Sequence, residues 1–229
     1  MKLVKLTTLT AAMAMTGMTF SALAAESATL NIKGTVIPAS CNVTVTGDVD
    51  YGSLQIAELQ AAGETNGGYQ LGEKSSGFNI ACAGSTKVAL SFKADSQPAS
   101  VPAMTPVMSG ISEYTVSKLG VLGQAGGKDV GYYAIISPAA SHINVDDEEQ
   151  YPLKSLTNGV SWTSPTGNTA YDLSGTNIYS WGGASGNPVA GKNISGNFKV
   201  VAVINPDVAN SVTEETKFDA NTTLTVRYL

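Results

Sequence analysis

The sequence predicts an all-β fold, in which antiparallel strands form a sandwich. Apolar and polar residues alternate in several short segments, and this period of two is the pattern of a half-buried strand. The 24 glycines and 9 prolines suit a chain with many turns. Only residues 54–62 have the composition of a helix, and this stretch is too short to define a helical class.

The first 24 residues have the pattern of a secretory signal peptide. Two lysines lie near the start, residues 6–23 carry no charge, and Ala22-Leu23-Ala24 matches an A-x-A cleavage site. A membrane anchor is the alternative, which the threonine-rich composition and the small residues at the end of the stretch disfavour. We therefore expect cleavage after Ala24 and a mature chain of residues 25–229.

Export would place the two cysteines, Cys41 and Cys82, in an oxidising compartment, where they can form one intramolecular disulfide. Closing a loop of about 40 residues stabilises a fold by about 4 kcal/mol in the chain-entropy model. A reactive thiol pair is the alternative. It is disfavoured because the spacing is not C-x-x-C and no histidine is nearby.

The mature chain contains a series of segments that we expect to be strands. They are residues 28–36, 41–45, 78–82, 88–92, 129–137, 198–204 and 218–228. Segment 97–110 is rich in proline and serine, and segment 137–195 is rich in glycine, serine and asparagine. Because the strands around them are too few to close two separate sheets, we expect both segments to be surface insertions of one domain.

Charge and composition argue against several functional classes. A net charge of −5 with only 13 basic residues argues against a nucleic-acid-binding protein. One histidine and two cysteines argue against a zinc site. We expect no catalytic residues, no metal ion and no cofactor.

Three short motifs suggest chemistry, and in each the ordinary interpretation is favoured. Residues 186–192 have P-loop spacing, but Asn193 stands where a magnesium-binding Ser or Thr is needed. The acidic run 146–149 lacks the alternating positions and central glycine of a calcium loop. The sequence has no G-x-S-x-G motif whose serine the single histidine, His142, could activate as a nucleophile.

Four aromatic residues lie in the segment that is rich in glycine, serine and asparagine. They are Trp162, Tyr171, Tyr179 and Trp181. Aromatic rings among small polar residues can stack on a sugar or contact a host surface. They can equally anchor a long loop on the sandwich, and this is the interpretation that we favour.

Both ends of the mature chain are alternating segments without a cap. Near the N-terminus, the residues of one face are Ala28, Leu30, Ile32, Gly34 and Val36. An exposed strand of this kind pairs readily with another molecule, and some proteins use such pairing as their function. On the pattern alone, a first strand packed within its own sandwich is the alternative that we favour.

Four segments together resemble the pilin subunits of chaperone–usher fimbriae. Residues 32–41 resemble the pilin N-terminal extension and first cysteine, and 49–52 resemble the acidic–aromatic–Gly element that follows. Residues 77–82 resemble the strand of the second cysteine, and 223–229 resemble the last pilin strand with its penultimate tyrosine. The middle of the chain, roughly 96–195, matches poorly, which suggests an uncharacterised fimbrial-like branch of the family.

The resemblance implies an immunoglobulin-like sandwich that lacks its last strand. It implies that residues 25–36 are a donor-strand extension and that 37–229 are the pilin-like domain. A periplasmic chaperone would fill the resulting groove first, and the extension of the next pilin subunit would replace it at the outer-membrane usher. Residues Ala28, Leu30, Ile32, Gly34 and Val36 would enter the groove. The last strand would contact the groove and the chaperone through Leu224, Val226, Tyr228 and Leu229.

The function implied is that of a structural subunit, carried through the periplasm to a fimbrium on the cell surface and used in adhesion. A host surface or glycan is then a further candidate partner. The alternative is a self-contained periplasmic or secreted sandwich that binds a ligand, such as a carbohydrate, with its N-terminal strand in its own sheet.

Overall fold

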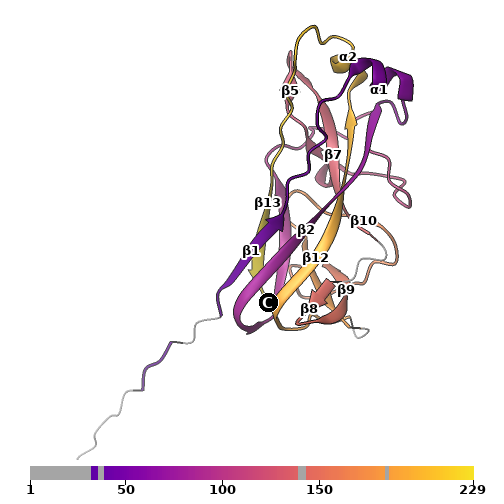
Figure 1. Ribbon diagram of the computed structural model, residues 1–229. Coiled ribbons are helices and arrows are strands. Elements are labelled where there is room, and N and C mark those ends of the chain that lie inside the picture. Colours follow the sequence, from indigo (N-terminus) through magenta and orange to yellow (C-terminus); the bar gives the residue numbers. More distant parts are fainter. Residues whose placement is uncertain (1–31, 36–38, 139–142, 184–185) are drawn as a thin grey trace, which may run out of the picture. The chain divides into compact units, whose positions relative to one another are not determined.

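The computed structural model describes residues 32–35, 39–138, 143–183 and 186–229 (Figure 1). The chain divides into two units, Met1–Val36 and Ile37–Leu229. In the first unit, residues 32–35 have no regular secondary structure, and the side chain of Ile32 is 88% exposed. Ala28, Leu30 and Val36, which complete the expected N-terminal strand, lie outside the described residues, as does the expected signal peptide.

The second unit consists mainly of strands. They are β1 (Cys41–Thr46), β2 (Tyr69–Thr86), β3 (Val88–Ala94), β4 (Gly120–Val121), β5 (Gln124–Ala125), β6 (Lys128–Asp129), β7 (Gly131–Ser137), β8 (Ile143–Val145), β9 (Glu148–Ser155), β10 (Thr169–Ala170), β11 (Ile178–Gly182), β12 (Gly191–Ile204) and β13 (Thr222–Tyr228). The helical elements are α1 (Ile56–Ala62), α2 (Pro206–Ala209) and a 3-10 turn, Val116–Lys118. The all-β prediction is confirmed.

The strands pair along one path, in the order β1-β2-β12-β8-β9-β11-β3-β13. Strand β7 pairs with β12 on the edge opposite to β2, and β4 and β10 pair with β7. Every pairing among the described strands is antiparallel, as expected. The ends of the path, β1 and β13, lie side by side in Figure 1 and do not pair with each other.

Two faces of this path pack against each other and enclose the core. The ring of Phe92 on β3 meets that of Phe198 on β12 edge to face, with centroids 6.3 Å apart. The rings of Phe78 on β2 and Trp181 on β11 are 6.2 Å apart. Because β2 and β12 belong to one layer and β3 and β11 to the other, these contacts show the sandwich that the sequence predicts.

The expectation that residues 137–195 form a surface insertion is wrong. This segment supplies β8 to β11 and the start of β12, and β8, β9 and β11 connect the two layers. Leu153, Leu173 and Ile178 from this segment are each at most 2% exposed. The segment is therefore part of the core.

The helix expected at 54–62 is confirmed as α1. The second helix, α2, escaped prediction because it has only four residues. Asn205 caps it by accepting a hydrogen bond from the backbone N–H of Asp207, and Pro206 occupies its first turn. Within the described residues, no helix combines the length and the apolar character needed to cross a bilayer.

Candidate functional site

The two strands at the ends of the sheet path leave apolar side chains half covered. On β13, Leu224 and Val226 face inward but are only partly buried, and on β1 the same holds for Val43. Strand β3, which pairs on both sides, shows the contrast, because Phe92 is fully buried. The sandwich is therefore open along the seam between β1 and β13.

A groove lies in this seam, with a cavity volume of about 210 Å³. One wall comes from residues 45–51 and the other from residues 218–224. The floor is formed by apolar and aromatic side chains of the core, which are Leu122, Tyr133, Ile135, Phe198 and Val200. The groove is thus an apolar trough bordered by two extended segments.

The groove continues into a larger hollow of about 1180 Å³ beside α1 and α2. The two cavities share Val49 and Tyr51 on one wall and residues 218–220 on the other. Leu54, Leu59 and Val208 line the hollow near the helices. The apolar trough is therefore open towards the helical end of the sandwich.

The wall at 218–224 alternates as the sequence predicts. Its half-buried positions are Phe218, Ala220, Thr222 and Leu224, and its exposed positions are Asp219, Asn221 and Thr223. The ladder to β3 begins at Thr222, and just beyond it the backbone N–H of Asp95 donates to the oxygen of Asn221. Residues 218–220 precede this pairing and continue the line of β13. Four inward side chains thus line this wall at the spacing of a β-strand.

Tyr51 holds the opposite wall in place. Its hydroxyl lies 3.1 Å from the backbone oxygen of Val200 and 3.3 Å from that of Gly72. Gly72 has a φ of 75° and stands at an irregularity in the β2–β12 ladder, where a carbonyl is left free to accept such a bond. Burial raises the pKa of Tyr51 to about 12. The phenol therefore fixes a segment that has no strand partner of its own.

The disulfide expected from the two cysteines is present. Cys41 on β1 is bonded to Cys82 on β2, and the two residues stand opposite each other in the ladder. At the other edge, the backbone N–H of Leu229 donates to the oxygen of Lys87, which continues the β13–β3 pairing to the last residue. The side chains of Tyr228 and Leu229 are each 47% exposed.

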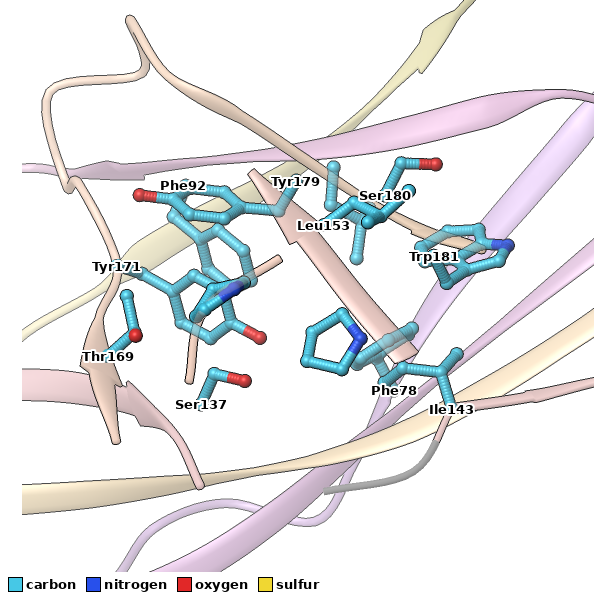
Figure 2. Close-up of a pocket in the computed structure, with 13 residues that line it drawn as sticks. Phe78, Phe92, Ser137, Ile143, Leu153, Thr169, Tyr171, Tyr179, Ser180 and Trp181 are labelled. Atoms are coloured by element: carbon cyan, nitrogen blue, oxygen red, sulfur yellow. The ribbon is translucent and has the colours of Figure 1, made fainter. Parts of the chain in front are cut away.

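The aromatic residues of segment 137–195 have a structural role. Tyr171 stacks on Phe92 with centroids 4.2 Å apart, and the ring of Tyr179 meets both edge-on, as Figure 2 shows. The cavity that they line with Trp181 has a volume of about 20 Å³, which suffices for one water molecule. Trp162 is half-buried, and its Nε1–H donates to the oxygen of Gly159 at 3.1 Å.

The short motifs also have structural explanations. The Asp146 carboxylate accepts hydrogen bonds from the backbone N–H groups of Lys192 and Asn193, and these bonds lower its pKa. The P-loop-like segment leads into β12 where a helix would be needed. Among the residues that the structure describes, no three acidic, histidine or cysteine side chains gather as a metal site would require. His142 lies outside the described residues.

Comparisons with known proteins link the chain to one sequence family and one relative. Residues 30–134, less than half of the chain, match a family described as a protein of unknown function, DUF1120. Protein GltF of Escherichia coli (strain K12) is 38% identical over 96 residues, which cover 40% of this chain and 38% of GltF. The match thus spans less than half of the length of that relative.

Two solved structures similar to this chain are pilus proteins. One is a chain of a chaperone–usher pilus studied for rod uncoiling, with a TM-score of 0.38, 14% identity, and coverage of 90% of this chain and 98% of that one. The other is the P pilus rod subunit PapA, with a TM-score of 0.35, 16% identity, and coverage of 84% and 100%.

Proposed function

We propose that this chain is a structural subunit of a chaperone–usher fimbria, which polymerises when residues 25–36 of one copy fill the groove of another. The observation that carries the proposal is the open seam between β1 and β13, with its half-covered apolar side chains. An inserted strand would pair with a wall of the groove and would cover Leu224 and Val226. The sequence supplies a suitable segment, since Leu30, Ile32 and Val36 would project on one face of an inserted strand.

The energetics favour insertion. Each large aliphatic side chain that leaves water for the groove contributes roughly 1.5–3 kcal/mol. The inserted strand would also form main-chain hydrogen bonds with the wall of the groove, and these add to the gain. Without an inserted strand, the backbone groups of that unpaired edge can bond only to water. Gly34 would lie where the floor leaves no room for a side chain.

The same groove explains the other partners that the family resemblance suggests. An empty apolar seam promotes aggregation, so a periplasmic chaperone would cover it until an outer-membrane usher exchanged the chaperone for the next subunit. Leu224, Val226 and Tyr228 would contact the chaperone, and the carboxylate of Leu229 would be held by its cationic side chains. The subunit would be exported and non-enzymatic, and it would serve adhesion to a host surface or glycan.

Expression of the exported chain with and without a fimbrial chaperone tests the proposal. We expect the full chain alone to aggregate, and the co-expressed chaperone to keep it soluble and to permit polymers. A variant that lacks residues 25–36 should bind the chaperone and form no polymers. A stable full-length monomer with a cooperative melt, unaffected by the deletion, would instead identify a self-contained binding module.

A further inference from the structure

The rim of the groove is acidic on both sides. Asp48 and Asp50 are exposed on one wall, and Asp219 is exposed on the other. No lysine or arginine occurs in the wall segments 45–51 and 218–224. A strand that enters this groove therefore passes between carboxylates, which favours a cation at the matching position of that strand.

The segment that would enter has one cation. Residues 25–36 contain a single basic residue, Lys33, which lies between Ile32 and Gly34. When Ile32 and Gly34 face the floor, the side chain of Lys33 projects outward, because successive side chains of a strand alternate. Lys33 would then stand at the level of the rim, where the carboxylates are.

The numbers of inward positions on the two partners agree. The segment offers five, Ala28, Leu30, Ile32, Gly34 and Val36, and the wall with the rest of β13 offers five, Phe218, Ala220, Thr222, Leu224 and Val226. When the two sets are matched in antiparallel strands, Ala28 stands opposite Val226 and Lys33 stands opposite Asn221. Asp219 is then a diagonal neighbour, within reach of a long side chain. In a parallel pairing, Lys33 would stand opposite Thr223.

The floor at this point supports the same alignment. The Tyr133 hydroxyl lies 2.7 Å from Oγ1 of Thr222 and 3.3 Å from the backbone oxygen of Asn221, so its phenol reaches the wall there. In the matched antiparallel alignment, Gly34 stands opposite Ala220. Gly34, which has no side chain, therefore lies within two residues of the point where the Tyr133 phenol reaches the wall.

We propose that the N-terminal segment of a second copy binds with Lys33 opposite Asn221 and beside Asp219, and that the rim carboxylates set the register of the inserted strand. This inference rests on the proposed function. The alternation of apolar and polar residues excludes a shift of the inserted strand by one residue along the wall, because that shift would turn Lys33 into the groove. It does not exclude a shift of two residues. One such shift moves Lys33 opposite Thr223, away from Asp219. The other places Lys33 directly opposite Asp219 but beside Lys217, and it leaves one apolar position of each partner unmatched.

Cross-linking tests the register directly in the full chain assembled with its chaperone and usher. Lys33→Cys combined with Asn221→Cys should give polymers that remain covalently linked in boiled, non-reducing samples. Lys33→Cys combined with Thr225→Cys should not, because Thr225 is exposed on the same face four residues away. Cross-links at Thr225 alone, or none in variants that still polymerise, would overturn the register and leave the proposed function intact. Failure of the unmodified chain to polymerise would overturn both.

Reversal of the charges tests the carboxylates. Lys33→Glu should slow polymerisation roughly tenfold, since an attractive cross-strand pair becomes repulsive. Asp219→Lys should have a similar effect, and the two substitutions together should recover most of the rate. Glu148→Lys, an equal charge change on exposed β9, is the matched control and should leave the rate unchanged. Equal rates for all four variants would overturn the role of the rim.

Discussion

The backbone N–H of Cys41 donates a hydrogen bond of 2.9 Å to the phenolic oxygen of Tyr228. This bond joins the first residue of β1 to the last residue of β13, the two strands at opposite ends of the sheet path. The groove lining ends short of this contact, at Val45 and Leu224. One end of the seam is therefore tied together, while the other is open towards the helices.

Loss of this tie should weaken the fold modestly. Tyr228→Phe keeps the ring and removes the acceptor, so we expect a loss of about 0.5–1.5 kcal/mol of unfolding free energy. Urea unfolding of the assembled protein, followed by tryptophan fluorescence, measures this change. Tyr228→Leu removes the ring as well and should cost more. An unchanged midpoint for Tyr228→Phe would mean that water replaces the bond without loss.

The two faces of β13 should respond differently to a lysine. Leu224→Lys places a charge in the apolar groove and removes an aliphatic contact worth roughly 1.5–3 kcal/mol, so polymer yield should fall by at least about tenfold. Thr225→Lys puts the same side chain on the exposed face of the neighbouring position and should assemble normally. Comparable yields from both variants would show that the groove face is not used.

Reduction of the disulfide should destabilise the chain strongly. The bond closes a loop with a sequence separation of 41, for which the chain-entropy model gives about 4 kcal/mol. We expect the thermal unfolding midpoint to fall in the presence of a reductant. The double variant Cys41→Ser with Cys82→Ser should melt at the reduced temperature with or without reductant, which separates loss of the bond from side effects of the reagent.

The buried phenol of Tyr51 should make the fold sensitive to alkali. Its pKa is raised from 10.0 to about 12 by burial, so the folded state keeps a proton that the unfolded chain loses first. The contribution of the protonated Tyr51 phenol to the free energy of unfolding is fully present below pH 10, and it is lost as the pH rises through about 12. Unfolding followed by circular dichroism across this range should show the decline.

Tyr51→Phe is the control for this effect, because it removes the titrating group. Tyr114 and Tyr132, whose pKa values are also raised to about 12, remain in the variant. The alkaline decline should therefore become shallower without disappearing. The variant should also be less stable at neutral pH, since the carbonyls of Val200 and Gly72 lose a donor. An equally steep decline would assign the effect to the other phenols.

Much of the fold could be predicted from local pattern. Strict alternation identifies β1 and β13, and two cysteines in an exported chain leave one possible pairing. Bracketing glycines also locate α1. In each case a few neighbouring residues carry the signal, because side-chain periodicity follows directly from backbone geometry.

The failures have physical causes as well. Strands β10 and β11 have two and five residues, too few to show a period among glycines and serines. Strand β2 extends over 18 residues because it pairs with both β1 and β12, and these partners lie far away in sequence. The groove itself requires residues 45–51 and 218–224 to meet, and only the family resemblance predicts that meeting from sequence.

The ladder between β2 and β12 limits how fast this chain can fold. Lys199 and Glu73, joined by an ion pair across it, are 126 positions apart. A central pair of strands with such a separation cannot form until nearly the whole polypeptide is available, and non-local pairing of this kind is slow. Throughout that delay the disulfide between Cys41 and Cys82 needs only a short loop. Early oxidation would therefore give this chain its first covalently fixed pair of strands, β1 and β2.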